Sequence, residues 1–270
     1  RLLSAVPAED SAATRACPPA DAFCPPTNEG VRGTAIMGAA GSRGGQVTAT
    51  EQRPAEGTAS SSVRNPHFLL RRIHSLVGLV PVGAFLLFHL WENSQSRFGQ
   101  EHYNTYVVEK IQNINYIFLL EIFLIALPIL FHAVYGLVVF WMGRSNVTHY
   151  GYFRNWMWWL QRWSGVGILL FLLMHVIGTR IVAIWSEAIR QDMYSHMQNL
   201  FSQPAFLVPY VIGLVLSVFH FCNGVWSASI VWGLTTTPRG QKAMQVVMGV
   251  VFVVVTALGI HGMLGFFLSS

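Results

Sequence analysis

Five long runs of apolar residues constrain the fold of this chain more than any other feature. They cover residues 68–91, 115–141, 156–185, 205–232 and 243–267. A helix that crosses the hydrocarbon core of a bilayer needs about 20 mostly apolar residues, and each run is long enough. Inside lipid the backbone must satisfy its own hydrogen bonds, so these runs are expected to be helices. We therefore predict an all-α membrane protein with five transmembrane helices.

The composition agrees with a membrane-embedded chain. Only 11% of the residues are charged, whereas an ordinary soluble domain has about 25%. Indole prefers the membrane interface, and most tryptophans stand near the ends of the runs. These are Trp91, Trp141, Trp156, Trp158, Trp159, Trp185 and Trp232.

Cysteine usage excludes several kinds of site. The chain has three cysteines, Cys17, Cys24 and Cys222, and no CxxC or CxxCH motif. Iron–sulfur clusters, structural zinc and covalently attached c-type haem therefore have no support in this chain.

The first 62 residues differ from the rest. They are rich in Ala, Gly, Ser, Thr and Pro, with few large apolar side chains and without the continuous apolar core of a secretory signal peptide. Such a segment cannot bury a core, so we predict a disordered low-complexity tail over 1–62. No function is assigned to the tail, and residues 63–270 form the membrane domain.

Basic residues mark one side of the predicted bundle. On that side, the loops and span ends carry basic residues with no acidic residue among them: Arg64, Arg71, Arg72, Arg144, Arg154, Arg162, Arg239 and Lys242. Acidic residues on the other side offset its basic ones: Glu92, Glu101, Glu109, Glu187 and Asp192. The net charge of +5 is thus interpreted as an orientation signal rather than a nucleic-acid footprint. It predicts a multi-pass protein of the inner (cytoplasmic) membrane, with the N-terminus inside and the C-terminus outside.

Four histidines stand deep in four different runs: His89, His132, His175 and His220. Ionisable residues inside a membrane are costly and usually mark function. At about 1.5 Å per helical residue, His89 and His175 lie ~27–30 Å from the inner starts of their helices. On the same scale His132 and His220 lie ~21–24 Å from the outer starts of theirs. The first two therefore share an outer level, and the other two share an inner level.

Two stacked histidine pairs inside a helical bundle suit two b-type haems, each iron taking one imidazole from either face. The bundle of the first four helices would enclose both. The alternative is that all four histidines only form hydrogen bonds between helices. A single zinc or copper ion bound by all four is disfavoured because the levels are too far apart. His261, in the fifth run, has no partner at its level and is interpreted as a satisfied interior or interfacial histidine.

Haem propionates need charged or polar partners. Arg71, Arg72 and Arg162 lie near the inner level, and Arg180 lies near the outer one. Arg matches carboxylates through its planar fork, although these residues also fit as membrane-edge anchors. His74, at the inner mouth of the first helix, is a further candidate for a propionate contact.

Glu121 is the only carboxylate well inside an apolar run, on the outer side of the second helix. A carboxyl group in apolar surroundings tends to keep its proton. Near an outer haem, it could exchange that proton with a quinone. The alternative is an interhelical hydrogen bond.

Several stretches resemble a known family, the single-chain di-haem cytochrome b membrane anchors of succinate:quinone oxidoreductases, and within it the Bacillus-type subunit. They are RRIHSLVGLVPVGAFLLFHL (71–90), LEIFLIALPILFHAVYG (120–136), RNWMWWLQRWSG (154–165), MHVIGTR (174–180), FHFCNGVWS (219–227) and TPRGQ (237–241). The resemblance spans about three quarters of the chain, from residue 68 to residue 267, and leaves out the tail.

The resemblance implies that His132 and His220 ligate a proximal haem, and His89 and His175 a distal one. It implies a flavoprotein partner with FAD and an iron–sulfur partner on the cytoplasmic side. It also implies a quinone, often menaquinone, that reacts near the distal haem. The complex would be a succinate dehydrogenase or fumarate reductase of the respiratory chain and the tricarboxylic acid cycle.

Two other functions remain open at this stage. The chain could be the cytochrome b subunit of another quinone-linked dehydrogenase, such as a formate dehydrogenase or hydrogenase. It could also be a proton-coupled or metal transporter that uses intramembrane His and Glu. Transporters often show inverted repeats and broken helices, and the sequence shows neither.

Overall fold

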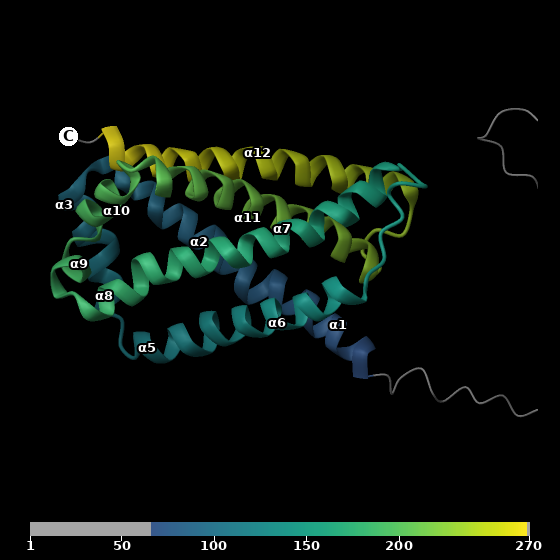
Figure 1. The fold of residues 1–270 in the computed structure, drawn as a ribbon, viewed down its shortest axis with the longest axis horizontal. Helices are drawn as coiled ribbons and strands as arrows, with labels where there is room; N and C mark the ends of the chain where they lie inside the picture. The colour runs from purple at the N-terminus through teal and green to yellow at the C-terminus, as the bar shows by residue number, and fades with distance from the viewer. Residues whose placement is uncertain (1–65, 269–270) are drawn as a thin grey trace, which may run out of the picture. The chain divides into compact units, whose positions relative to one another are not determined.

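The computed structural model describes residues 66–268 (Figure 1), and the predicted tail over 1–62 lies outside them. Five helical segments in this part of the chain are long and apolar enough to cross a membrane. They are Pro66–Phe98, Ile117–Met142, Phe153–Trp185, Pro204–Val231 and Pro238–Phe267. The prediction of an all-α protein with five membrane-crossing helices is confirmed.

The first three spans are built from consecutive helical elements. The first contains α1 (Pro66–Val77), η2 (Gly78–Val82), α2 (Gly83–Asn93) and η3 (Ser94–Phe98). The second contains α5 (Ile117–Leu120), η5 (Glu121–Ala126) and α6 (Leu127–Met142). The third contains α7 (Phe153–Val176), η6 (Ile177–Ile181) and α8 (Val182–Trp185). The last two are single helices, α11 (Pro204–Val231) and α12 (Pro238–Leu268).

Wider π-helical turns interrupt each of the first three spans, at η2, η5 and η6. Proline explains the first two, because it has no N–H to donate and its ring crowds the preceding turn. Pro81 lies inside η2, and Pro128 stands in the first turn of α6, directly after η5. No proline accompanies η6.

The spans begin and end a few residues away from the predicted limits. The fifth starts at Pro238 rather than 243, because proline suits the first helical turn and polar Arg239 and Lys242 can still be helical at the membrane edge. The first continues to Phe98 as a 3-10 turn. At its end, α11 turns through Gly233 (φ 74°), and Leu234 donates to the carbonyl of Ser229 at 2.8 Å.

Short helices that hydropathy alone did not predict connect the spans at one end. They are α3 (Gln100–Tyr103), η4 (Asn104–Glu109), α4 (Lys110–Gln112), α9 (Glu187–Gln191) and α10 (Met193–Phe201). Ser186 caps α9 and Asp192 caps α10, each accepting a hydrogen bond from a backbone N–H in the first turn. Burial by itself would raise the pKa of Asp192, but hydrogen bonds from Ser195, Asn104 and Gln100 together hold that pKa below its ordinary value.

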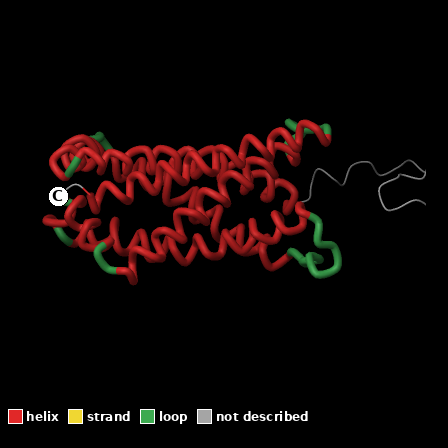
Figure 2. The backbone as a smooth tube through the Cα atoms, turned by 90° about the horizontal axis from the view of Figure 1, so that it is seen from above, coloured by secondary structure: helices red, strands yellow, loops and turns green. Residues whose placement is uncertain are grey.

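The helices lie side by side, and their connections gather at two opposite ends (Figure 2). We call these the Pro66 end, which also holds residues 143–152 and 232–237, and the Phe267 end, which holds 99–116 and 186–203. The helix α11 packs between α7 and α12, α12 also packs on α2 and η3, and α6 packs on α1 and α7.

Two apolar clusters hold this arrangement together. One lies at the Phe267 end and is largely aromatic: Tyr103, Val107, Tyr194, Met197, Phe201, Tyr210 and Phe266. The other joins α2, α11 and α12: Leu90, Leu214, Val218, Cys222 and Val255. Many large apolar side chains elsewhere on the spans are exposed, as expected for surfaces that face lipid.

Candidate paired-histidine sites

Four histidines on four spans form two pairs of neighbouring rings. His132 of α6 and His220 of α11 form the Pro66-end pair, with ring centroids 6.1 Å apart and planes at 88°. His89 of α2 and His175 of α7 form the Phe267-end pair, with centroids 5.7 Å apart and planes at 78°. The structure thus brings together the histidines that the sequence placed at common levels.

The two pairs are separate sites. His74 stacks on His132, and His89 stands 15 residues further along the same span. At 1.5 Å per helical residue, the pairs are about 20 Å apart along the bundle. Among residues 66–268, no group of three or more His, Cys, Asp or Glu side chains is arranged to hold a metal ion.

The separation of the rings fits a metal placed between them. Imidazole nitrogens bind transition metals at about 2.0–2.1 Å, so two imidazoles on opposite sides of one ion have centroids roughly 6 Å apart. Both measured separations, 5.7 Å and 6.1 Å, are close to this value. Two imidazoles per iron, offered from facing helices of a bundle, are a donor set that suits b-type haem.

In the Pro66-end pair, both Nδ1 atoms contact oxygen atoms. His132 Nδ1 lies 3.1 Å from the carbonyl oxygen of His74, and His220 Nδ1 lies 3.1 Å from Ser164 Oγ. Metal-bound histidines commonly donate their other ring N–H to such partners. The arrangement therefore leaves Nε2 of each ring available to a metal.

The Phe267-end pair is held more loosely. His175 Nδ1 lies 3.3 Å from the hydroxyl of Tyr210. The amide nitrogen of Asn93 is 3.4 Å from each of the two nitrogens of the His89 ring. Both distances are long for a hydrogen bond, and because they are equal they do not determine which ring nitrogen carries the hydrogen. That amide donates instead to the carbonyl oxygen of His89 at 2.7 Å.

A chain of polar side chains, which the sequence did not predict, extends from His89 towards the Phe267 end. Tyr103 donates from its hydroxyl to Asn93 Oδ1 at 3.2 Å. Burial, and then the charge of Glu92, raise the pKa of Tyr103 above its ordinary value, so its hydroxyl remains a donor. The four-residue spacing of His89 and Asn93 was a signal that could have been used. Nothing local in the sequence pointed to Tyr103 or Tyr210.

His74 lies against the Pro66-end pair. Its ring is stacked on that of His132, with centroids 4.1 Å apart and planes within 5°. Its Nε2 is buried and has no hydrogen-bond partner among the described residues. A buried polar atom of this kind requires an explanation, and the polar edge of a bound cofactor would supply one.

Two of the three candidate arginines at the Pro66 end donate hydrogen bonds to carbonyl groups at the C-terminal ends of helices. Arg162 donates to the carbonyl of Val139 at 2.6 Å, and its guanidinium lies 3.8 Å from the ring centre of Trp158. Arg72 donates to the carbonyl of Val231 at 2.7 Å. Arg71 is exposed. Arg72 and Arg162 thus cap the C-terminal ends of α11 and α6, with further N–H groups left over.

Glu121 and Arg180 pair with each other across the second and third spans. Arg180 Nη2 and Nε donate to Glu121 Oε2 at 2.6 Å and 3.2 Å. Both side chains are partly exposed, 44% for Arg180 and 27% for Glu121. The interhelical alternative considered for Glu121 therefore has a definite partner in the structure.

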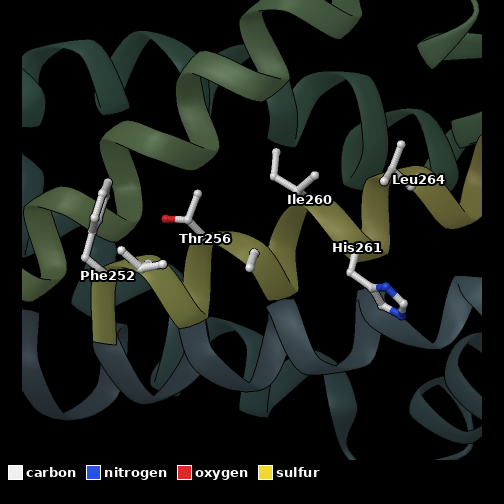
Figure 3. Close-up of a pocket in the computed structure, with 7 residues that line it drawn as sticks. Phe252, Thr256, Ile260, His261 and Leu264 are labelled. Atoms are coloured by element: carbon white, nitrogen blue, oxygen red, sulfur yellow. The ribbon is translucent and has the colours of Figure 1, made fainter. Parts of the chain in front are cut away.

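His261 lies apart from both pairs. It is exposed on α12, so of the two expected settings, interior or interfacial, the interior one is wrong. It lines a shallow pocket of about 530 Å³ together with Phe252, Thr256, Ile260 and Leu264. Figure 3 shows its ring turned to the opposite side of the helix from Thr256. An exposed face of a membrane span is where lipid is expected.

Comparison with known proteins identifies a matching family and a similar relative. Residues 144–258, which include His175 and His220, match the family described as succinate dehydrogenase/fumarate reductase transmembrane subunit. The chain is also similar to the succinate dehydrogenase cytochrome b558 subunit of Bacillus subtilis (strain 168). The two are 39% identical over 202 residues, which cover 75% of this chain and 98% of that relative.

Proposed function

Because the chain belongs to the succinate dehydrogenase/fumarate reductase transmembrane subunit family, we propose that it carries electrons between an iron–sulfur subunit and a membrane quinone through two b-type haems. The chain is a membrane cytochrome b subunit of this family, and so the membrane part of an oxidoreductase complex. The dicarboxylate chemistry belongs to the complex and not to this chain. Family membership also argues against a transporter or a subunit of an unrelated dehydrogenase.

The observation that carries the proposal is the presence of two imidazole pairs, each spaced as two ligands of one metal. His132 and His220 would hold the proximal haem, and His89 and His175 the distal one. When bound, haem supplies a one-electron redox centre inside the membrane. Four spans hold the rings, and the surrounding apolar side chains limit the access of water to them.

Polar side chains near each pair are the proposed partners of the propionates. At the Pro66 end, these are His74, whose Nε2 has no hydrogen-bond partner within residues 66–268, and Arg71, Arg72 and Arg162. At the Phe267 end it is Arg180, which uses two N–H groups on Glu121 and has others left. Burying anionic groups without such partners would be costly.

Glu121 is the proposed proton-exchange residue for quinone chemistry near the distal haem. Its carboxylate stands on the side of the second span that faces Arg180, near the Phe267 end. The ion pair would fix the position of the carboxylate, so that a proton gained or lost by a quinone has a nearby acceptor or donor. The quinone is proposed to be menaquinone.

The orientation follows from the charges at the two ends. The described part of the Pro66 end is basic and carries no acidic residue, and basic loops tend to remain cytoplasmic. Flavoprotein and iron–sulfur subunits, which carry FAD and the clusters, are therefore proposed to bind at the Pro66 end in the inner membrane. Quinone would react at the opposite end, so electron transfer would couple to the membrane potential at about 2.3 kcal/mol per charge per 100 mV.

A reduced-minus-oxidised absorption spectrum of the purified chain, with haem quantified per polypeptide, tests the proposal. A b-type spectrum with two haems per chain is the expected result. A folded, membrane-inserted chain without haem would overturn it.

A further inference from the structure

Ser164 is buried in α7 beside His220, and its neighbours restrict what its hydroxyl can do. The residue is only 4% exposed. Ser164 Oγ donates to the main-chain oxygen of Gln161 at 3.0 Å and lies 3.1 Å from Nδ1 of His220. The hydroxyl therefore contacts one atom that can only accept and one that can do either.

Counting protons determines the direction of the second contact. A serine hydroxyl has a single hydrogen, and here it points to the Gln161 carbonyl. The oxygen of Ser164 must then act as the acceptor towards His220, so Nδ1 of His220 carries the hydrogen. Nε2 of the same ring keeps its lone pair, which is the form that binds a metal.

The same helix also holds the backbone of His220. The side-chain amide of Gln161 donates to the main-chain oxygen of His220 at 3.1 Å. Asn223 donates to Gln161 Oε1 at 2.7 Å and so fixes the orientation of that amide. A Cβ on Gly165 would lie 3.1 Å from His220 Cε1, so the glycine leaves room for the ring on this side.

We propose that Ser164 is a positioning residue that holds His220 in the Nδ1–H tautomer and makes Nε2 a stronger donor to the proximal haem iron. This inference rests on the proposed ligand role of His220. A hydrogen bond from Nδ1–H to oxygen increases electron density on the imidazole, and a more electron-rich ligand favours the oxidised metal. Ser164 therefore lowers the reduction potential of the haem at the Pro66 end.

The experiment measures the midpoint potentials of the haems in the purified chain for Ser164→Ala and Ser164→Cys. Ser164→Ala removes the acceptor, and Ser164→Cys keeps a weaker one of similar shape. Ser229→Ala is the matched control, because Ser229 is buried in α11, donates to the carbonyl three residues earlier and contacts no histidine in its hydrogen bonds.

The expected result is a positive shift of one potential in Ser164→Ala, a smaller positive shift in Ser164→Cys and no shift in Ser229→Ala. Unchanged potentials in Ser164→Ala with both haems retained would overturn the proposal. If Ser164→Ala loses one haem, the proposal requires Ser164→Cys to retain it with a raised potential. Loss in both Ser164 variants, or an equal shift in Ser229→Ala, would overturn it.

The proposed function fails in a different way. Absence of haem from the unsubstituted chain would overturn both proposals. Normal haem content with an unmoved potential in Ser164→Ala would overturn only the role of Ser164.

Discussion

The two histidine pairs have similar ring separations but differ in what supports the rings. At the Pro66 end, Nδ1 of His132 faces a carbonyl and Nδ1 of His220 faces a hydroxyl oxygen that can only accept. At the Phe267 end, His175 faces a tyrosine hydroxyl that can donate or accept, and His89 has no well-defined ring partner. One pair therefore has fixed tautomers, and the other does not.

This difference shows that spacing and support are separate properties of a ligand pair. Spacing follows from which helices pack together, and both pairs have it. Support depends on single side chains and carbonyls next to each ring. In the Pro66-end pair, hydrogen bonds at Nδ1 already orient both rings with Nε2 free to bind a cofactor. In the Phe267-end pair, the ring of His89 would have to be oriented when the cofactor binds.

The largest expected effect comes from removing a ring. His132→Ala or His220→Ala should lose the proximal haem, and His89→Ala or His175→Ala the distal one, because an axial ligand disappears. Haem per chain should fall from two to one in every case. His261→Ala, a control on the exposed face of α12, should retain both. If the two variants of one pair lost different haems, the assignment of those two histidines to the same haem would be wrong.

Glu121→Gln should lower quinone reduction about 100-fold, the smaller end of the usual range for a general acid or base, with haem content unchanged. Quinone reductase assays on the assembled complex measure it. Glu187→Gln is the matched control, because Glu187 also pairs with an arginine, Arg190, but in an exposed connection. Equal losses in the two variants would contradict a specific role at the Phe267 end.

Gly78→Ala should reduce occupancy of the proximal site alone. A Cβ on Gly78 would overlap the imidazole of His132, and such overpacking typically costs about 1–3 kcal/mol. Gly249→Ala adds the same methyl group in α12, where nothing lies within 4 Å, and should be neutral or slightly stabilising. Haem content and thermal unfolding in detergent measure both. An unaffected proximal site in Gly78→Ala would show that His132 can move freely.

Tyr210→Phe should have a smaller effect, confined to the distal haem. It removes the hydrogen bond to His175, worth about 0.5–1.5 kcal/mol, and keeps the ring against Phe171 and Phe201. The potential of the distal haem should shift while the proximal one stays constant. A shift in the potential of the proximal haem instead would contradict the assignment of Tyr210 to the distal haem.

Asp192→Ala should leave both haems unchanged. The loss of the cap on α10 costs about 0.5–2 kcal/mol of stability at neutral pH. The lowered pKa of Asp192 means that its contribution is present above the unfolded-state pKa and is lost as the pH falls through the folded-state value. Thermal unfolding at neutral and acidic pH tests this. A changed haem spectrum would show that the Phe267-end connections reach the pairs.

The sequence predicted the five spans because hydropathy and span length are set by the bilayer itself. It also predicted which histidines share a level, since depth depends only on the helical rise. Those rings are neighbours in the structure, and their role as ligands stays a prediction. Position along a span says nothing about rotation around it, so the contacts of Ser164 and Tyr210 were not foreseen.

Partners between distant segments were equally hard to predict. Glu121 and Arg180 are 59 residues apart, and each was considered separately for a role in cofactor chemistry. His261 was expected to be interior or interfacial because its run is apolar, and α12 presents it outwards. Hydropathy could not decide these points, because it does not distinguish the face of a helix that meets lipid from the face that meets protein.

The π-helical turns at η2, η5 and η6 are positions where a membrane span can lose one residue without rotating the helix beyond them. A π-helical turn accommodates one residue more than the α-helix around it. Removing one residue from Gly78–Val82 would convert the turn to regular helix and leave His74 and His89 on nearly the same faces. A deletion elsewhere between His74 and His89 would rotate His89 by about 100° relative to His74, and so away from His175. Among natural relatives, we therefore expect single-residue gaps in the membrane spans to fall at these three turns.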